Sequence, residues 1–249
     1  ALGARLQADR VSLGDAVESI DAVKQTVQTK SGRQYAYGHL ISTMPLNHLI
    51  RCAPGVVDAK LPEQLVYSAT HVVGVGMNGS PPEHLKTKCW MYFPENNSPY
   101  YRVTVFSNYS ANNCARPGAQ WSLMAETSES SAKPVDQAGL VEETLLALEE
   151  DGLLPDRDAI ASVVSRRIPM GYPTPFIGRD ALVDPALRAF EQKNIWSRGR
   201  FGAWKYEVAN QDHSFAQGYE CAERLLNGGG AEYEPTLHQP NLVNSRRNP

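Results

Sequence analysis

The chain has 249 residues, of which 42% are hydrophobic and 20% charged, and 24 Lys and Arg against 27 Asp and Glu give a net charge of −3. This composition is typical of a globular protein of one or two domains and excludes a fibre or a fully disordered chain. The lack of a basic stripe argues against nucleic-acid binding, and no apolar run reaches the roughly 18 residues of a membrane helix. Four cysteines without a C-x-x-C pair argue against a metal site and favour a reduced, cytoplasmic protein.

The first forty-five residues predict short strands. Residues 23–29 and 34–37 alternate between apolar and polar side chains around the turn Lys30-Ser31-Gly32-Arg33, which indicates a β-hairpin. The apolar run 39–44 predicts a buried strand that ends at Pro45. A helix is expected from Asn47 to about Cys52.

Residues 60–170 predict a mainly antiparallel sheet with one attached helix. Strands are expected at segments rich in β-branched and aromatic residues, namely 66–76, 89–93, 101–107, 121–127 and 162–168. Asp136 is expected to cap a helix that stops at Gly152. Because no regular crossover helices join the strands, the sheet is expected to be antiparallel.

The last third of the chain predicts a loop, two helices and a tail. Three prolines predict a stiff irregular loop over 169–175. A short helix is expected to start at Asp184-Pro185. A final helix from about Asn210 to Asn227, ending in three glycines, carries at helical spacing Phe215, Tyr219, Ala222 and Leu226. Residues 231–249 are expected to form an extended tail.

Three features of the predicted sheet bear on ligand binding. Residues 74–79 match G-x-G-x-x-G, but Ser80-Pro81-Pro82 opens no helix, so we interpret the glycines as part of a strand and a turn. Arg102 lies at sheet level and is either a paired structural cation or a clamp for a carboxylate or phosphate. Trp90 and Tyr92 share one strand face, which is typical of a core pair or of a sugar or nucleotide pocket.

Polar side chains are concentrated in residues 197–214, a glycine-containing turn that opens the final helix. They are Arg198, Arg200, Lys205, Tyr206, Asn210, Gln211 and His213. Small residues permit close approach of the backbone to a ligand, and a helix start favours an anion or a polar ring. A solvated polar loop is the alternative, and the residues alone leave both interpretations open.

At this segment the sequence resembles the eukaryotic-type UDP-galactopyranose mutases, flavoenzymes with an amine-oxidase-like FAD fold. The resemblance is strongest over residues 196–215 and continues, in the order of the family, over 68–76, 89–95, 100–110 and 171–175. It implies a mixed α/β (α+β) fold, in which part of a Rossmann-type FAD-binding domain adjoins a mainly antiparallel substrate domain. The expected domains are 1–58 and 179–230 for the FAD part, 59–178 for the substrate domain and 231–249 for the tail.

The resemblance also implies an isomerase that interconverts UDP-galactopyranose and UDP-galactofuranose, in galactofuranose biosynthesis. In such enzymes N5 of reduced FAD attacks the anomeric carbon and UDP leaves, and NADPH is the implied reductant. Arg102 and Arg200 are the implied catalytic residues. The implied substrate-binding residues are Trp90, Tyr92, Arg102, Tyr172 and Tyr206. The implied FAD contacts are Arg200, Gly202, Asn210, Gln211 and Ser214, and no metal is implied.

The family's amino-terminal half, with its nucleotide-binding fingerprint, does not precede Ala1. We therefore expect the chain to correspond to a carboxyl-terminal half, to bind FAD poorly and to be inactive alone, and to act with the missing half in cis or in trans. Two alternatives are another FAD-dependent oxidoreductase of the amine-oxidase type and a non-catalytic remnant or interaction module. The sequence leaves open whether the protein is a homo-oligomer.

Overall fold

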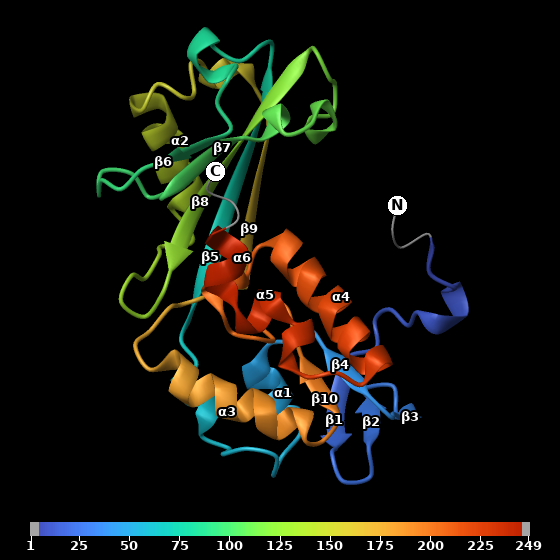
Figure 1. The fold of residues 1–249 in the computed structure, drawn as a ribbon. Coiled ribbons are helices and arrows are strands. Elements are labelled where there is room, and N and C mark those ends of the chain that lie inside the picture. The colour runs from blue at the N-terminus through green and yellow to red at the C-terminus, as the bar shows by residue number, and fades with distance from the viewer. Residues whose placement is uncertain (1–4, 246–249) are drawn as a thin grey trace. The chain divides into compact units, whose positions relative to one another are not determined.

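The computed structural model describes residues 5–245, which form two compact units (Figure 1). The first unit combines both ends of the chain, residues 1–66 and 173–249, and the second consists of residues 67–172. Both boundaries fall inside the segment 59–178 that the sequence assigns to the substrate domain. At the first boundary, the turn Leu61–Gln64 packs against the helix Leu46–Cys52 of the first unit.

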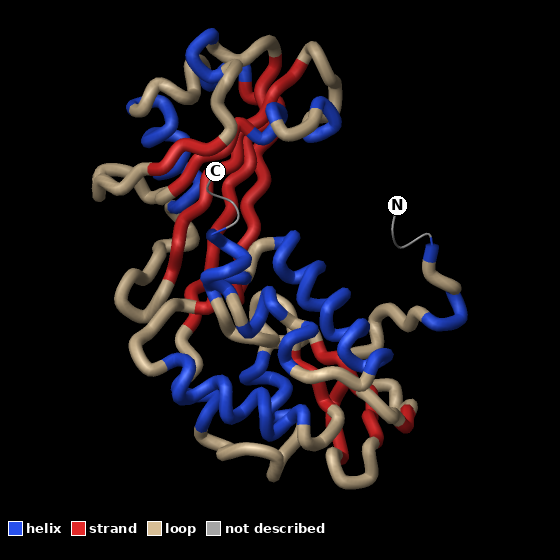
Figure 2. The backbone as a smooth tube through the Cα atoms, viewed as in Figure 1, coloured by secondary structure: helices blue, strands red, loops and turns tan. Residues whose placement is uncertain are grey.

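The second unit is built on a five-stranded sheet in the order β6-β7-β8-β5-β9. Its strands are β5 (Tyr67–Asn78), β6 (Trp90–Tyr92), β7 (Arg102–Val105), β8 (Gln120–Glu129) and β9 (Ile160–Pro173). The pairs β6–β7, β7–β8 and β5–β8 are antiparallel. The strands lie side by side in Figure 2, and the mixed α/β (α+β) class with a mainly antiparallel sheet is confirmed.

One face of this sheet carries the core of the second unit. Helix α2 (Leu140–Glu150) buries Leu140 and Leu148 in one cluster with Val75 and Leu123. Because side chains alternate across a strand, the residues between these core positions point to the other face, which α2 does not cover. Arg102 lies on that second face.

Within residues 5–66 and 173–245, the first unit contains two small sheets and five α-helices. β1 (Val17–Asp21), β2 (Thr26–Thr29) and β3 (Gln34–Ala36) are antiparallel, whereas β4 (Leu40–Ser42) pairs in parallel with β10 (Ile195–Ser197). The helices are α1 (Leu46–Cys52), α3 (Arg179–Glu191), α4 (Gln211–Asn227), α5 (Pro235–His238) and α6 (Pro240–Ser245). Among residues 5–245, no helix is both long and apolar enough to cross a bilayer.

The glycines of the G-x-G-x-x-G pattern lie where the sequence predicts. Gly74 and Gly76 are in β5, and Gly79 adopts a φ of 87° in the turn that follows. This positive φ is readily adopted only by glycine. The pattern therefore belongs to a strand and a turn.

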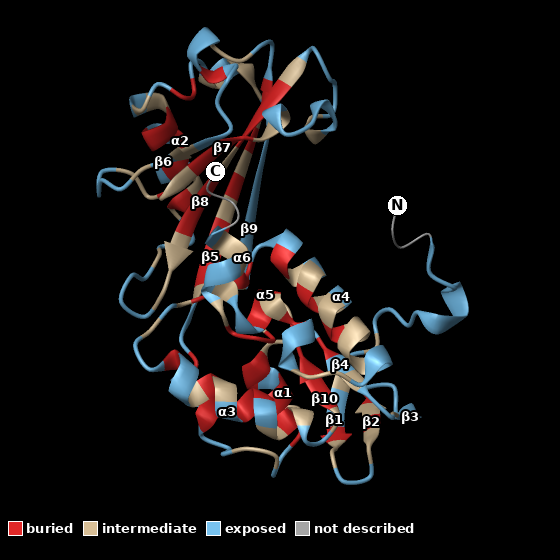
Figure 3. Cartoon of the chain, in the orientation of Figure 1, coloured by how far each residue is buried: buried red, intermediate tan, exposed pale blue. Residues whose placement is uncertain are grey.

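The expected loop over 169–175 is wrong, because β9 continues through Pro169 to Pro173. Proline lacks the N–H that an inner strand needs, but β9 is the edge of its sheet, where a missing donor faces solvent. Most of β9 is accordingly exposed (Figure 3).

Two predictions in the last third of the chain also need correction. Helix α3 begins at Arg179, directly after Gly178 with its φ of 88°, and accommodates Pro185 in its interior instead of starting there. In place of an extended tail, residues 231–245 form a 3-10 turn followed by α5 and α6. Buried contacts of Glu234, described below, hold this segment; residues 246–249 of the expected tail lie outside the described residues.

Candidate functional site

Arg102 stands in β7 on the uncovered face of the sheet and binds a carboxylate of the next strand. Its Nε donates to Glu126 Oε2 at 2.5 Å, and its Nη2 donates to Glu126 Oε1 at 2.8 Å. The register places the two residues opposite each other, so the guanidinium and carboxylate meet in the bidentate arrangement. Both side chains are largely buried. Arg102 is therefore a paired cation, with Nη1 outside this ion pair.

Three aromatic rings surround the Arg102 guanidinium. Its Cζ lies 5.5 Å from the ring centre of Trp90, 5.9 Å from that of Tyr92 and 5.7 Å from that of Tyr101. Trp90 and Tyr92 are more than half exposed, so they line a surface and are not a core pair. Cation–π contacts of this kind orient the guanidinium plane.

Tyr172 joins the same cluster from the end of β9. The pKa of Arg102 is raised above its ordinary value, chiefly by the hydrogen bond to Glu126 and further by hydrogen bonding to the hydroxyls of Tyr92 and Tyr172. Burial acts in the opposite direction and is outweighed. Burial also raises the pKa of Tyr101, with the charge of Glu126 adding to it. The cluster thus combines the Arg102–Glu126 ion pair with a Tyr101 phenol whose raised pKa favours its protonated form.

The sheet face that carries Arg102 is also hollowed. A pocket of about 510 Å³ lies over Gly74 and Gly76 and is lined by Met124 and Ser162 among others. A Cβ added at Gly74 would meet no atom closer than 3.9 Å. Gly74 therefore borders open space, whereas a Cβ at Gly76 would come within 2.7 Å of Ser162 Oγ.

The second group of candidate residues lies between β10 and α4, in the first unit. Arg200 follows Gly199, whose φ is 86°, and its Nε donates to the carbonyl of Ala209 at 2.8 Å. Gly202 is buried, and a Cβ there would clash with the carbonyl of Arg198. The turn itself therefore requires glycine at 202.

Asn210 and Gln211 are exposed at the start of α4, and Ser214 lies in its first turn. The Asn210 side chain makes no capping hydrogen bond, although the first N–H groups of a helix have no partner within it. His213 is buried, and neither of its ring nitrogens has a hydrogen-bond partner among the described residues. Polar atoms without a protein partner normally bind a polar ligand or an ordered water.

Tyr206 is half-exposed in a 3-10 turn that the carboxyl-terminal segment holds in place. Lys205 Nζ donates to the carbonyl of Leu237 at 3.2 Å, and Asn244 Nδ2 donates to the carbonyl of Glu207 at 3.3 Å. The residues expected to form a loose tail therefore support a candidate site residue.

The sequence analysis missed a buried ionic network behind this turn. Arg198 is 1% exposed and Glu234 is 0% exposed, and they are joined by Nε–Oε1 and Nη2–Oε2 hydrogen bonds of 2.5 and 2.8 Å. Arg224 Nη1 donates to Glu234 at 2.7 Å, and Arg198 Nη2 donates to Glu191 at 2.7 Å. Burial alone raises the pKa of Glu234, but the hydrogen bonds and charges of Arg198 and Arg224 lower it overall.

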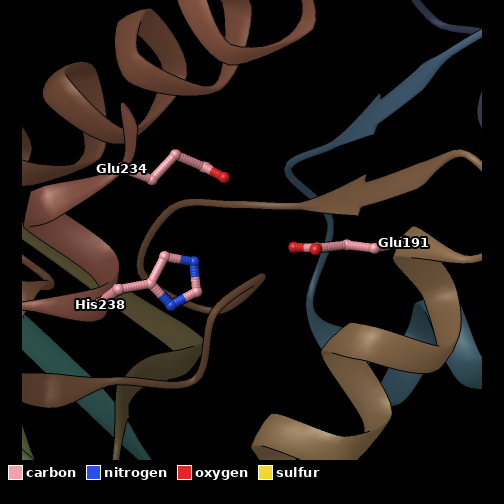
Figure 4. Close-up of side chains that lie close together, drawn as sticks. All are labelled: Glu191, Glu234 and His238. Atoms are coloured by element: carbon pink, nitrogen blue, oxygen red, sulfur yellow. The ribbon is translucent and has the colours of Figure 1, made fainter. Parts of the chain in front are cut away.

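Three side chains of this region, Glu191, Glu234 and His238, offer ligand atoms within 4.8 Å of one another and point toward one another in Figure 4. A metal ion would have to displace guanidinium contacts, because both carboxylates already pair with Arg198 and Arg224. Two carboxylates against two guanidiniums leave no net charge to attract a cation. We interpret the cluster as structural.

Glu126 is the candidate site residue that the sequence analysis missed. It lies in β8, whose neighbouring residues Leu123 and Ala125 are core positions. A carboxylate within a buried strand needs a cation nearby, so its presence in the sequence indicates a buried ion pair. The cation is found only from the register of β7 against β8, which is not local in the sequence.

No protein-family profile matches this sequence. Among solved structures, the chain is similar to reduced UDP-galactopyranose mutase, with a TM-score of 0.91, 42% identity, and coverage of 98% of this chain and 53% of that chain. Nearly all of this chain is thus similar to about half of a UDP-galactopyranose mutase.

The chain spans about half the length of that mutase, which fits the expectation of a carboxyl-terminal half. It is also similar to a CLA-producing fatty acid isomerase from P. acnes, with a TM-score of 0.57, 11% identity, and coverage of 84% of this chain and 47% of that chain. This second likeness shows the fold alone.

Proposed function

We propose that this chain is the substrate-binding half of an FAD-dependent UDP-galactopyranose mutase, an isomerase that interconverts UDP-galactopyranose and UDP-galactofuranose. The observation that supports it most is the likeness to reduced UDP-galactopyranose mutase at 42% identity over 98% of this chain. The proposal includes NADPH as reductant and a place in galactofuranose biosynthesis, which the resemblance of the motifs supports. It also includes a cytoplasmic location, which the four cysteines without a C-x-x-C pair support.

The residues at the start of α4 fit a flavin. The edge of a flavin ring carries carbonyl and imide groups. Polar groups that suit this edge are the exposed side chains of Asn210 and Gln211, the first N–H groups of α4, which no side chain caps, and the buried ring nitrogens of His213. Arg200 and Ser214 belong to the same segment. When bound, reduced flavin supplies the nucleophile for the anomeric carbon of the sugar.

The Arg102 cluster suits the leaving diphosphate. A guanidinium held by Glu126 and by the rings of Trp90 and Tyr92 presents N–H donors in a fixed direction. The hydroxyls of Tyr172 and Tyr206 are proposed as further hydrogen-bond partners of UDP. Donors placed before the reaction stabilise the charge that develops on departing UDP without rearrangement. We assign Glu126 the role of a positioning residue, because both of its carboxylate oxygens accept hydrogen bonds from Arg102.

The test is UDP affinity and mutase turnover in an enzyme assembled from this chain and the flavin-binding remainder of a UDP-galactopyranose mutase. We expect Arg102→Ala to raise the Kd of UDP by about 10- to 100-fold, the loss of a charged hydrogen bond worth about 1.5–3 kcal/mol. Arg167→Ala is the matched control, because Arg167 pairs with Glu129 near the surface of the same sheet. An assembled flavoprotein with no UDP affinity, or one indifferent to Arg102→Ala, would favour the amine-oxidase-type oxidoreductase.

A further inference from the structure

Gln217 is a polar side chain in the middle of the packed side of α4. It is 0% exposed, and the buried residues one helical turn away on either side are His213 and Cys221. A helix normally buries apolar side chains, because a polar group loses its bonds to water when it is buried. A buried amide at this position therefore needs specific partners.

The partners of Gln217 are two backbone groups of the turn between β10 and α4. Its Oε1 accepts from the Gly199 N–H at 2.8 Å, and its Nε2 donates to the Val208 carbonyl at 2.9 Å. An N–H needs an acceptor and a carbonyl needs a donor, so these partners fix which end of the amide faces which group. One side chain thus joins the two ends of the turn.

Arg200 spans the same turn with its own side chain. It follows Gly199 directly, and its Nε donates at 2.8 Å to the carbonyl of Ala209, which follows Val208 directly. Each end of the Arg200–Ala209 contact is therefore adjacent in sequence to a residue that Gln217 holds. Val208 and Ala209 are both buried, so the carbonyl that receives the Arg200 Nε–H lies in the interior.

The backbone of this turn is strained and depends on the contacts around it. Trp204 is a bulky residue with a φ of 49°, a conformation that residues with side chains rarely adopt. Residues held in this way persist only where their surroundings fix them, and they are frequent at functional sites. Arg179 Nε donates to the Trp204 carbonyl at 2.9 Å, and Gln217 holds the two ends of the turn.

We infer that Gln217 is a positioning residue for Arg200. Without the Gln217 amide, the segments before Arg200 and before Ala209 would move independently, and the guanidinium would lose its fixed direction. Gln217 acts through backbone groups on either side of the Arg200 contact. The inference rests on the proposed function for the role of Arg200 at the flavin, but not for how Arg200 is held.

The first test measures the Arg200 Nε–H in this chain alone. Its signal in a proton–nitrogen correlation spectrum is identified by its loss in Arg200→Lys, and its exchange with water reports the bond to the Ala209 carbonyl. Gln217→Met keeps the length of the side chain and removes both of its hydrogen bonds. We expect exchange of the Arg200 Nε–H to become about 5-fold faster or more, as the loss of one hydrogen bond gives.

Cys221→Ala is the matched control for a general loss of packing. Cys221 is buried one turn further along the same side of α4, and among residues 5–245 its free thiol does not bridge the turn. We expect this variant to lower the melting temperature, followed by circular dichroism, and to leave the Arg200 exchange unchanged. Should Gln217→Met not fold, Gln217→Asn gives the same comparison, because its amide is one methylene too short to span both partners.

The second test is a double-mutant cycle for turnover in the assembled enzyme described above. We expect Gln217→Met to lower kcat/KM by about 10- to 100-fold, because misplacing a group at the reacting atoms by about 1 Å has effects of this size. Where Arg200 is already Ala, the same substitution is expected to cost less than about 3-fold. A packing role alone would give equal losses in both backgrounds.

Three results would overturn the inference. They are an Arg200 Nε–H that exchanges equally fast in the parent and in Gln217→Met, an exchange that Cys221→Ala accelerates as much, and equal losses of turnover with and without the Arg200 guanidinium. An assembled enzyme without mutase activity would contradict the proposed function instead, and the exchange measurement on this chain would still decide how Arg200 is held.

Discussion

Removing the Glu234 carboxylate is expected to destabilise the first unit more than any surface substitution. In Glu234→Ala, two hydrogen bonds from Arg198 and one from Arg224 are lost. The two guanidiniums then share the single carboxylate of Glu191, so a buried group of four balanced charges becomes a group of three with a net charge of +1. Breaking a buried ion pair from one side costs about 3–5 kcal/mol. The Arg224 side chain is more exposed to water than that of Arg198. Because water partly solvates the Arg224 charge once Glu234 is removed, we expect the loss in unfolding free energy to lie within this range and not above it.

Hydrogen exchange measures this loss locally, because the two units of the chain need not unfold together. We expect amides in peptides from α4 to lose at least about 100-fold of their protection, the equivalent of about 3 kcal/mol at 1.4 kcal/mol per factor of ten. Amides of β5, in the second unit, serve as the internal reference and are expected to keep theirs.

The matched control is Glu223→Ala on the same helix, where the carboxylate accepts only a bond from the exposed Asn227. Surface changes of this kind alter stability by about 0.5 kcal/mol or less. If Glu234→Ala cost no more than Glu223→Ala, the reasoning about the buried network would be refuted. A large stabilisation by Zn²⁺ in the parent chain, lost in Glu234→Ala and His238→Ala, would refute the structural interpretation of the three-residue cluster.

Three further predictions concern the sheet of the second unit. Hydrogen bonds from Arg167 and His71 lower the pKa of Glu129 to about 2. The Glu129 carboxylate therefore contributes its full stabilisation above about pH 4.5 and loses it as the pH falls toward 2. We expect the difference in melting temperature between the parent and Glu129→Gln to shrink over this range of pH. Gly171→Ala is expected to lower the melting temperature, because its Cβ would clash with Thr70, at a cost of about 1–3 kcal/mol. In Gly74→Ala the new Cβ would meet no atom closer than 3.9 Å, so we expect an unchanged or slightly higher melting temperature. Equal losses in melting temperature for the two glycine variants would contradict this explanation.

The sequence predicts best the elements whose signals are local. The hairpin turn at Gly32, with a φ of 84°, and the end of α4 at Gly228, with a φ of 66°, lie at the glycines that the pattern marks. Glycine adopts a positive φ at little cost, so a glycine at the end of a turn or helix pattern is a local signal for it. Pro169 is the opposite case, because proline is compatible with a strand only at a sheet edge, and the sequence does not show which strand is the edge.

The sequence motifs select the candidate residues but do not show which side chains bind one another. Motif resemblance identified Arg102 and Tyr172, which the structure brings together in one cluster, but left open whether the arginine is paired. The register of β7 against β8 decides this by setting Glu126 opposite Arg102. Glu234 was missed for the same reason, since it lies 36 residues along the chain from the arginine that it binds.

Helix α4 shows that the side of a helix that local patterning predicts to be buried is not always the side that packs among residues 5–245. The helix, its ends and its apolar stripe all follow from local patterning, yet the buried side of α4 is the polar one, where Gln217 accepts from the Gly199 N–H at 2.8 Å and donates to the Val208 carbonyl at 2.9 Å. Exposing large apolar side chains in one stripe is unfavourable in water, and isolated stripes of this kind mark contact surfaces. Among residues 5–245 the apolar side therefore lies open at the surface, whereas the polar side is the one that packs against the rest of the unit.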